Sequence, residues 1–174
     1  MYRRCDRQAR AETLFWTIGP RQVGKAALAG WGELGAELAA GAAEIGIWPF
    51  ADPSVDQLLG HYDFVVAETY PAAFYPAVGV VFPPRSGGKG NQGARMRQAP
   101  ALLRSAEQLD VELLPQLTAA IRAGFATEHG RDDGFDATVG LLGLLQILAA
   151  DRFQGAPVDE AVLTIEGWML GLGA

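Results

Sequence analysis

The sequence contains a single cysteine, Cys5, and no apolar run long enough to cross a membrane. One cysteine excludes a disulfide framework and a zinc site made of cysteines, and the neighbouring arginines are expected to lower the pKa of its thiol. Every apolar run is shorter than the roughly 18 residues that a membrane helix needs, and charged residues follow Met1 where a signal peptide would begin. The sequence therefore predicts a cytoplasmic protein of bacterial-looking composition that has no membrane partner.

Acidic residues are missing from one long segment, although the whole chain has a net charge of −6. That net charge argues against a general nucleic-acid-binding protein. Between residues 69 and 106 there is no Asp or Glu, and a second basic segment covers the first 32 residues. This distribution predicts either a basic rim beside an acidic site or two solvated surfaces on opposite sides of the molecule. In the first case Lys89 and Arg95 are candidate substrate contacts; the cations of the segment are Arg85, Lys89, Arg95, Arg97 and Arg104.

Apolar residues are abundant enough for a substantial core. A chain of 174 residues that is 49% hydrophobic predicts a single domain over residues 1–174 rather than a disordered chain. Helical periodicity dominates, and only short apolar runs have the character of strands, so we expect an α/β fold with few strands and many helices. The expected helices cover 6–16, 23–40, 94–106, 111–124 and 135–153, and the expected strands lie at 45–48 and 64–67.

The segment 63–71, DFVVAETYP, is the centre of the predicted sheet. Its apolar run 64–67 predicts a strand that is buried on both faces, as in a parallel sheet. Glu68 follows that strand, and Pro71 turns the chain and can begin a helix. Ligands and catalytic groups gather at the carboxyl ends of parallel strands, which makes Glu68 a candidate catalytic residue. The alternative is that Glu68 only solvates the end of the strand.

A second acidic cluster lies at 131–137, RDDGFDA. Asp132 or Asp133 suits the N-cap of the following helix, whereas Asp136 falls inside its first turn. The small residues of that helix would let it pack closely on a sheet, and its acidic end can then approach Glu68. Two or three carboxylates that converge there would bind Mg²⁺ or Mn²⁺, so Glu68 and Asp136 are candidate metal ligands. The small residues are Ala137, Gly140 and Gly143.

Three stretches together resemble a family of predicted nucleases, domain of unknown function 429. They are ETYP after a strand, the helix RDDGFDATVGLLGLL, and FW…GPRQVGKAALAGW. The resemblance extends over residues 13–171 and implies a ribonuclease-H-like fold and hydrolysis of phosphodiesters with Mg²⁺ or Mn²⁺. It gives Glu68 and Asp136 catalytic and metal-binding roles, with Asp133 as an accessory metal ligand. It also implies that Arg21 and Lys25 contact a phosphate of the substrate, which would be a nucleic acid or a phosphorylated small molecule.

The resemblance is incomplete at the N-terminus. The fold requires an acidic residue on a first strand, and nothing before Trp16 has the pattern of a strand. We therefore expect the N-terminal part of the fold to be missing from this chain. The sheet would then have an exposed edge, so we expect the chain to aggregate, to form a homodimer through that edge or to fold only marginally, and nuclease turnover would be low or absent.

Two other functions remain open at the level of sequence. The spacing GxxxxGK at 19–25 matches a phosphate-binding P-loop, and LFWTI before it has the composition of the required strand. The match fails at Ala26, where Ser or Thr should hold Mg²⁺. The second alternative is a binding or structural domain without catalysis.

Overall fold

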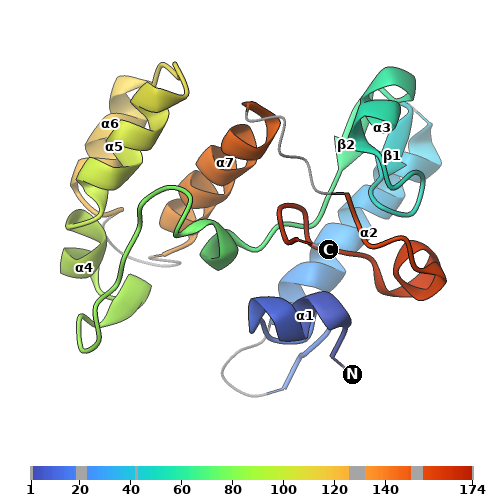
Figure 1. Ribbon diagram of the computed structural model, residues 1–174, viewed down its shortest axis with the longest axis horizontal. Coiled ribbons are helices and arrows are strands. Elements are labelled where there is room, and N and C mark those ends of the chain that lie inside the picture. Colours follow the sequence, from blue (N-terminus) through green and yellow to red (C-terminus); the bar gives the residue numbers. More distant parts are fainter. Residues whose placement is uncertain (1, 19–22, 42, 126–131, 150–154, 174) are drawn as a thin grey trace. The chain divides into compact units, whose positions relative to one another are not determined.

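Helices and one small parallel sheet are the regular elements of the part of the protein that the computed structural model describes (Figure 1). The structure describes residues 2–18, 23–41, 43–125, 132–149 and 155–173. Over these residues it is rich in helix, with seven α-helices and a two-stranded sheet, as expected. No helix among them is both long enough and apolar enough to span a membrane.

The chain divides into two units, which we describe separately. The first unit comprises Met1–Thr69 and Gln154–Ala174, and the second comprises Tyr70–Phe153. The expected single domain over residues 1–174 stays a prediction.

The first unit contains the sheet, and its local elements follow the sequence closely. Strand β2 runs parallel to β1, with Ile45 opposite Phe64. Helix α2 has the predicted bounds and is followed by Gly41 in a left-handed conformation that favours glycine. The side chain of Ser54 accepts a hydrogen bond from the backbone of Gln57 and so caps α3. The elements are α1 (Arg4–Ala9), α2 (Val23–Ala40), β1 (Ile45–Ile47), α3 (Val55–His61), β2 (Phe64–Val66) and a π-helical turn, η3 (Val162–Glu166).

Two expectations for the first unit are wrong. Strand β2 is not buried on both faces, because Phe64 and Val66 share one face of a two-stranded sheet and are 61% and 37% exposed. The helix expected over 6–16 ends at Ala9. There Arg10 adopts a left-handed conformation (φ 54°), and the N–H of Ala11 donates to the carbonyl of Asp6 at 2.8 Å, which closes the helix.

The second unit is a group of helices whose boundaries are set by proline and by the loops. The expected helix over 94–106 is two helices, because Pro100 starts a new helix at the beginning of α5. The expected helix over 111–124 begins only at Pro115 for the same reason. The elements are two 3₁₀ turns, η1 (Pro71–Phe74) and η2 (Gly88–Gly90), followed by α4 (Gln92–Met96), α5 (Ala99–Gln108), α6 (Pro115–Arg122) and α7 (Asp133–Ala149).

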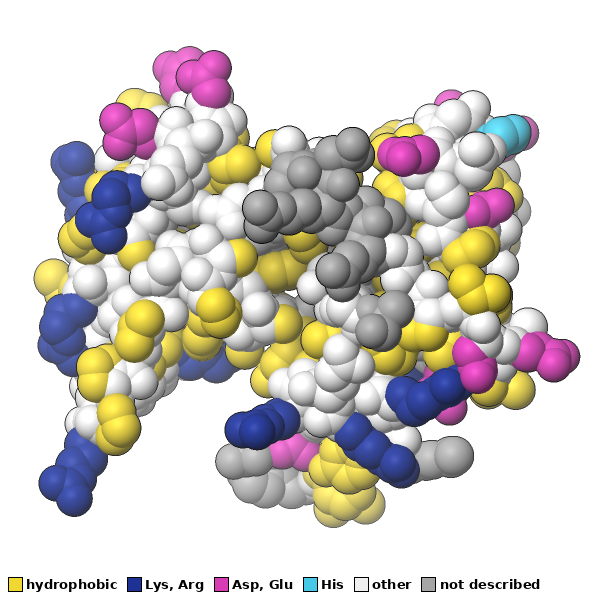
Figure 2. Space-filling model, viewed as in Figure 1, with side chains coloured by type: hydrophobic (Ala, Val, Ile, Leu, Met, Phe, Trp, Pro, Cys, Tyr) yellow, Lys and Arg dark blue, Asp and Glu magenta, His cyan; other side chains and the backbone are white. Residues whose placement is uncertain are grey.

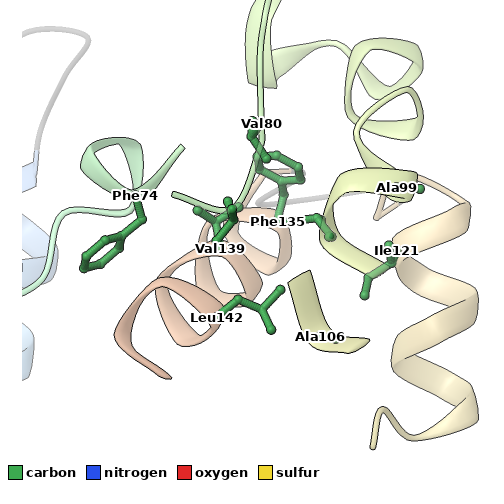
Figure 3. Packing of buried hydrophobic residues seen from close by; sticks show 10 residues of the cluster. Phe74, Val80, Ala99, Ala106, Ile121, Phe135, Val139 and Leu142 are labelled. Atoms are coloured by element: carbon green, nitrogen blue, oxygen red, sulfur yellow. The ribbon is translucent and has the colours of Figure 1, made fainter. Parts of the chain in front are cut away.

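Phe135 lies at the centre of the core of the second unit. It is fully buried, and its ring contacts those of Tyr75, Phe82 and Phe125 at centroid distances of 5.8–6.2 Å. Because Phe135 belongs to the first turn of α7, its burial fixes the start of that helix and therefore the position of Asp136. Figure 3 shows the cluster of buried residues to which Phe135 belongs; its other members are Phe74, Val78, Val80, Ala99, Leu102, Ala106, Ile121, Val139 and Leu142.

The small residues of α7 pack against the 3₁₀ turn η1 of the same unit. The sheet belongs to the first unit, so the expected contact of this helix with the sheet stays a prediction. A Cβ atom added to Gly143 would lie 2.3 Å from Cγ of Phe74 and 2.5 Å from its Cβ. At Gly140 the nearest atom, in Pro71, would be 3.7 Å away. Of these two glycines, Gly143 therefore marks the closer approach of α7 to η1.

We predict that Gly143→Ala lowers the free energy of unfolding by about 1–3 kcal/mol, because the new methyl group would overlap the inner atoms of the Phe74 side chain. Gly140→Ala is the matched control: its methyl group makes an ordinary contact, and the helix gains up to about 1 kcal/mol in propensity. Urea denaturation measures both effects. Equal stability of the two variants would contradict the packing described for α7.

Candidate functional site

Glu68 lies just beyond the end of β2 and is bound by an arginine from the N-terminal segment. Its backbone carbonyl accepts a hydrogen bond from Leu170 at 2.7 Å, which holds it beside the C-terminal segment. Its two carboxylate oxygens accept from Nη1 and Nη2 of Arg3 at 2.6 and 2.7 Å. This bidentate geometry is the strongest arrangement for a carboxylate and a guanidinium.

Arg3 also binds two other groups of the first unit. Its Nε and Nη2 donate to the fully buried carboxylate of Asp6, and Nη1 donates to the carbonyl of Glu166 at 3.3 Å. The backbone N–H of Arg3 donates to Asp6 as well, so this carboxylate reaches back to the start of α1. Burial disfavours the charged form of Arg3, but the hydrogen bonds that it donates to Glu68 and Asp6 outweigh this effect and raise the pKa of the guanidinium. Every N–H of this guanidinium is therefore engaged within the chain.

Sequence reasoning did not identify Arg3 as a partner of Glu68. The spacing of Arg3 and Asp6 at a helix start is a visible local signal, but the contact with Glu68 spans 65 residues. No spacing rule predicts such a pair. Basic and acidic side chains are close to one another around α1 in Figure 2, in agreement with these ion pairs.

Cys5 is fully buried beside this network, and the expected lowering of its pKa is wrong. Burial disfavours the thiolate and, together with the charges of Asp6 and Glu68, raises the pKa of Cys5 to about 11, although Arg3 acts in the opposite direction. Cys5 is thus an inert core residue in the folded protein.

Asp136 lies in the second unit and is paired with Lys89. The Nζ atom of Lys89, from η2, is hydrogen-bonded to Asp136 and lies 3.2 Å from Asp132. One oxygen of Asp136, Oδ1, is buried and has no hydrogen-bond partner among the described residues. The ring of Tyr75 lies nearby against Phe135.

The pKa values of this group follow from burial and charge. Burial raises the pKa of Asp136 against the opposing effect of Lys89, and the carboxylates of Asp132 and Asp133 add to the increase. Burial opposes the charge of Lys89, but hydrogen bonds to Asp136 and Asp132 outweigh it and raise its pKa. Burial, with the negative charge of Asp136, raises the pKa of Tyr75 to about 12. Lys89 therefore stays cationic at neutral pH and compensates the charge of Asp136.

The structure brings some of the predicted site residues together and separates others. Asp132, which we expected only as a possible cap, reaches Lys89, whereas Asp133 is exposed at the first position of α7. Glu68 belongs to the first unit and Asp136 to the second, so their predicted convergence on a shared metal stays a prediction. Within the described ranges, no group of three or more His, Cys, Asp and Glu is arranged to hold a metal ion.

The predicted substrate contacts have different environments. Lys25 is exposed in the first turn of α2, and Arg21 lies outside the described residues. Arg95 is only 2% exposed, and its guanidinium donates to the carbonyls of Lys89 and Gly124 at 2.5 and 2.8 Å. Through these bonds Arg95 joins the loop that carries Lys89 to the end of α6. Its role as a substrate contact stays a prediction.

The P-loop interpretation of 19–25 finds no support in the geometry that is described. Residues 14–18 do not form a strand. The N–H of Gly24 donates to the carbonyl of Trp16 at 2.8 Å, and a Cβ at Gly24 would lie 2.4 Å from the carbonyl carbon of Phe15. Glycine at this position permits a close approach of two backbone segments, and its N–H is already engaged within the chain rather than available to a phosphate.

We predict that Arg3→Leu lowers the free energy of unfolding by about 3 kcal/mol, because it leaves the buried carboxylate of Asp6 without its cation. Arg4→Leu is the control. Arg4 begins the same helix and pairs with Asp159 and Glu166, but it is exposed, so its loss should be much smaller. Thermal and urea denaturation measure both variants. Similar losses for the two would show that the network around Arg3 does not hold the unit together.

We predict that Cys5 is almost unreactive in the folded protein. With a pKa of about 11, roughly one thiol in a thousand is ionised at pH 8. An aromatic disulfide reagent should therefore modify the native protein about a hundredfold more slowly than the protein in denaturant. The rate is measured by the absorbance of the released thiolate. Rapid modification under native conditions would contradict the burial of Cys5.

Comparison with known proteins does not assign the chain to a family. No protein-family model, curated protein or solved structure matched it. The resemblance to domain of unknown function 429 rests on the three stretches given above.

Proposed function

We propose that the chain is a metal-dependent phosphodiester hydrolase of the ribonuclease-H-like type, with Asp136 as a metal ligand. The observation that carries this proposal is the buried Oδ1 of Asp136, which has no hydrogen-bond partner among the described residues. A buried oxygen without a partner costs about 1–3 kcal/mol, so such an atom in a native fold calls for a partner. A divalent cation is a partner that carboxylate oxygens suit.

The residues around Asp136 fit a divalent cation. The ammonium of Lys89 binds Oδ2 of Asp136 and lies 3.2 Å from Oδ2 of Asp132, which is the position of a cation held by two acids. A metal ion in this position would have to bind both oxygens of Asp136 to give Oδ1 a partner. A bound metal would activate a water molecule and stabilise the leaving oxygen of a phosphodiester. Lys89 must leave Asp136 when a metal binds, and it extends from a glycine-rich turn, η2. The released ammonium would then bind the phosphate of the substrate.

Residues outside this group enter the proposal through the resemblance alone. It gives Glu68 a catalytic and metal-binding role and gives Arg21 and Lys25 the role of substrate contacts. The substrate class is a nucleic acid or a phosphorylated small molecule. A homodimer through the edge of the sheet also belongs to the proposal, and it is supported by the exposure of Phe64 on β2.

One observation favours a binding or structural domain without catalysis as the second candidate. Both oxygens of Glu68 are bound by Arg3, a cation that does not deprotonate and whose donors are all engaged. Glu68 in this arrangement stabilises the first unit, and a metal ion would have to compete with Arg3 for its oxygens. Binding of metal and cleavage of substrate must therefore be measured separately.

We predict that calorimetric titration with Mn²⁺ detects binding that Asp136→Asn weakens. Removal of a residue that only supports a metal ligand typically lowers metal affinity about 10- to 100-fold. Loss of Asp136, a ligand itself, should lower the affinity for Mn²⁺ by at least that factor. Glu107→Gln is the control, because it also removes one negative charge, at an exposed position of α5; it should leave the affinity for Mn²⁺ unchanged. Lys89→Met should strengthen Mn²⁺ binding, because the ammonium no longer competes for the two carboxylates.

Cleavage of labelled single- and double-stranded nucleic acids in Mn²⁺ completes this test. Metal-dependent cleavage that is lost in Asp136→Asn supports the hydrolase. Binding without cleavage favours the domain without catalysis, and the absence of Mn²⁺ binding in both the native protein and Lys89→Met would overturn the metal site. Circular dichroism checks that each variant keeps its helices.

A further inference from the structure

The first unit contains a cavity of about 920 Å³ with aromatic walls. This size is within the range of sites that bind small organic molecules. One face of α2 forms a wall, with Ala27, Trp31 and Leu34 at helical spacing. The aromatic side chains of the lining are Phe15, Trp16, Trp31, Trp48, Phe50 and Trp168, together with Tyr2.

Several of these aromatic side chains are accessible from solvent. Trp31 is 41% exposed, Trp16 46% and Phe15 58%, although all three are large and apolar. Next to Trp31, a Cβ atom added at Gly30 would meet no atom within 4 Å, so this part of the wall is open. Figure 2 shows hydrophobic side chains exposed beside the charged side chains around α1. Exposed apolar surface of this kind marks a place where a ligand or partner binds.

The charged residues of the lining are one cation and three carboxylates. Arg3 is the cation, so the formal charge of the lining is +1 − 3 = −2. All N–H groups of Arg3 are engaged with Glu68, Asp6 and the carbonyl of Glu166, which leaves no donor for an anionic ligand. The carboxylate of Glu68, by contrast, is 28% exposed and keeps lone pairs that a ligand can use. Glu166 also pairs with Arg4, whose Nε lies 3.5 Å from its carboxylate, but its side chain remains 23% exposed. The net charge of the lining therefore favours positive charge at the polar end of the cavity.

Aromatic rings and carboxylates favour the same kind of ligand. The faces of Trp and Phe rings carry negative charge density and attract cations, and the rings also bury apolar surface. We propose that this cavity binds an apolar organic cation, whose charge lies near Glu68 and Glu166 and whose body lies against Trp31. The proposal concerns the first unit and does not rest on the metal-dependent activity proposed for Asp136.

A pair of probe ions of equal shape and opposite charge tests the sign of the preferred ligand. Tetraphenylphosphonium is the cation and tetraphenylborate the anion, and quenching of tryptophan fluorescence at fixed ionic strength reports binding of each. We expect the dissociation constant of the cation to be at least about tenfold lower than that of the anion. Equal affinities would indicate an apolar surface only and overturn the proposal, as would a preference for the anion or no binding of either ion.

Two pairs of variants test the location of the ligand. Trp31→Ala should weaken binding of the phosphonium about tenfold, whereas Leu38→Ala, on the same helix with the same 41% exposure but outside the lining, should not. Glu166→Gln should reduce the preference for the cation about two- to fivefold, and the exposed Glu160→Gln should leave it unchanged. Calorimetry measures these affinities without relying on tryptophan fluorescence. Equal effects within either pair would place the ligand elsewhere and overturn the proposal.

Discussion

The first unit depends on the hydrogen bonds and ion pairs made by the guanidinium of Arg3. This guanidinium joins three parts of the chain that are far apart in sequence: α1 through Asp6, the end of β2 through Glu68, and η3 through the carbonyl of Glu166. Because Asp6 is fully buried, its charge is tolerated only while this cation is present. The same network forms the polar end of the aromatic cavity, so the stability of the unit and the charge preference of its cavity have one physical source.

In the second unit, a lysine rather than an arginine compensates the charge of a partly buried carboxylate, Asp136. The two cations differ in geometry and exposure. Arg3 binds Glu68 with two parallel hydrogen bonds and is largely buried, with a side-chain exposure of 13%. Lys89 is a point charge on a flexible side chain and is 43% exposed. The cation of the pair at Asp136 is therefore more exposed and less rigidly held than the cation of the pair at Glu68. This contrast is the reason that Asp136, rather than Glu68, is the centre of the proposed metal site.

Buried side chains hold in place both the group around Asp136 and the residues that line the cavity. Phe135 in the core of the second unit fixes the first turn of α7, and with it the distance between Asp136 and Lys89. Arg95 holds the loop of Lys89 by hydrogen bonds to backbone carbonyls, at a cost in desolvation that only a fully bonded guanidinium offsets. In the first unit the buried Trp48 directly follows β1 and donates from Nε1 to the carbonyl of Pro53 at 3.0 Å, while Trp31 remains accessible at the cavity. The positions of the candidate functional side chains thus depend on the packing of core residues.

The sequence by itself determined the local elements: the bounds of α2, the two strands, the cap at Ser54 and the turn at Pro71. These follow from periodicity, capping and proline geometry, which act over a few residues. The tertiary structure alone decided that Asp132 and not Asp133 reaches Lys89, and that Arg3 binds Glu68. Those outcomes depend on which side chains meet across distant segments, such as the 65 residues between Arg3 and Glu68. Such meetings are set by packing and by compensation of buried charge, and no local pattern encodes them.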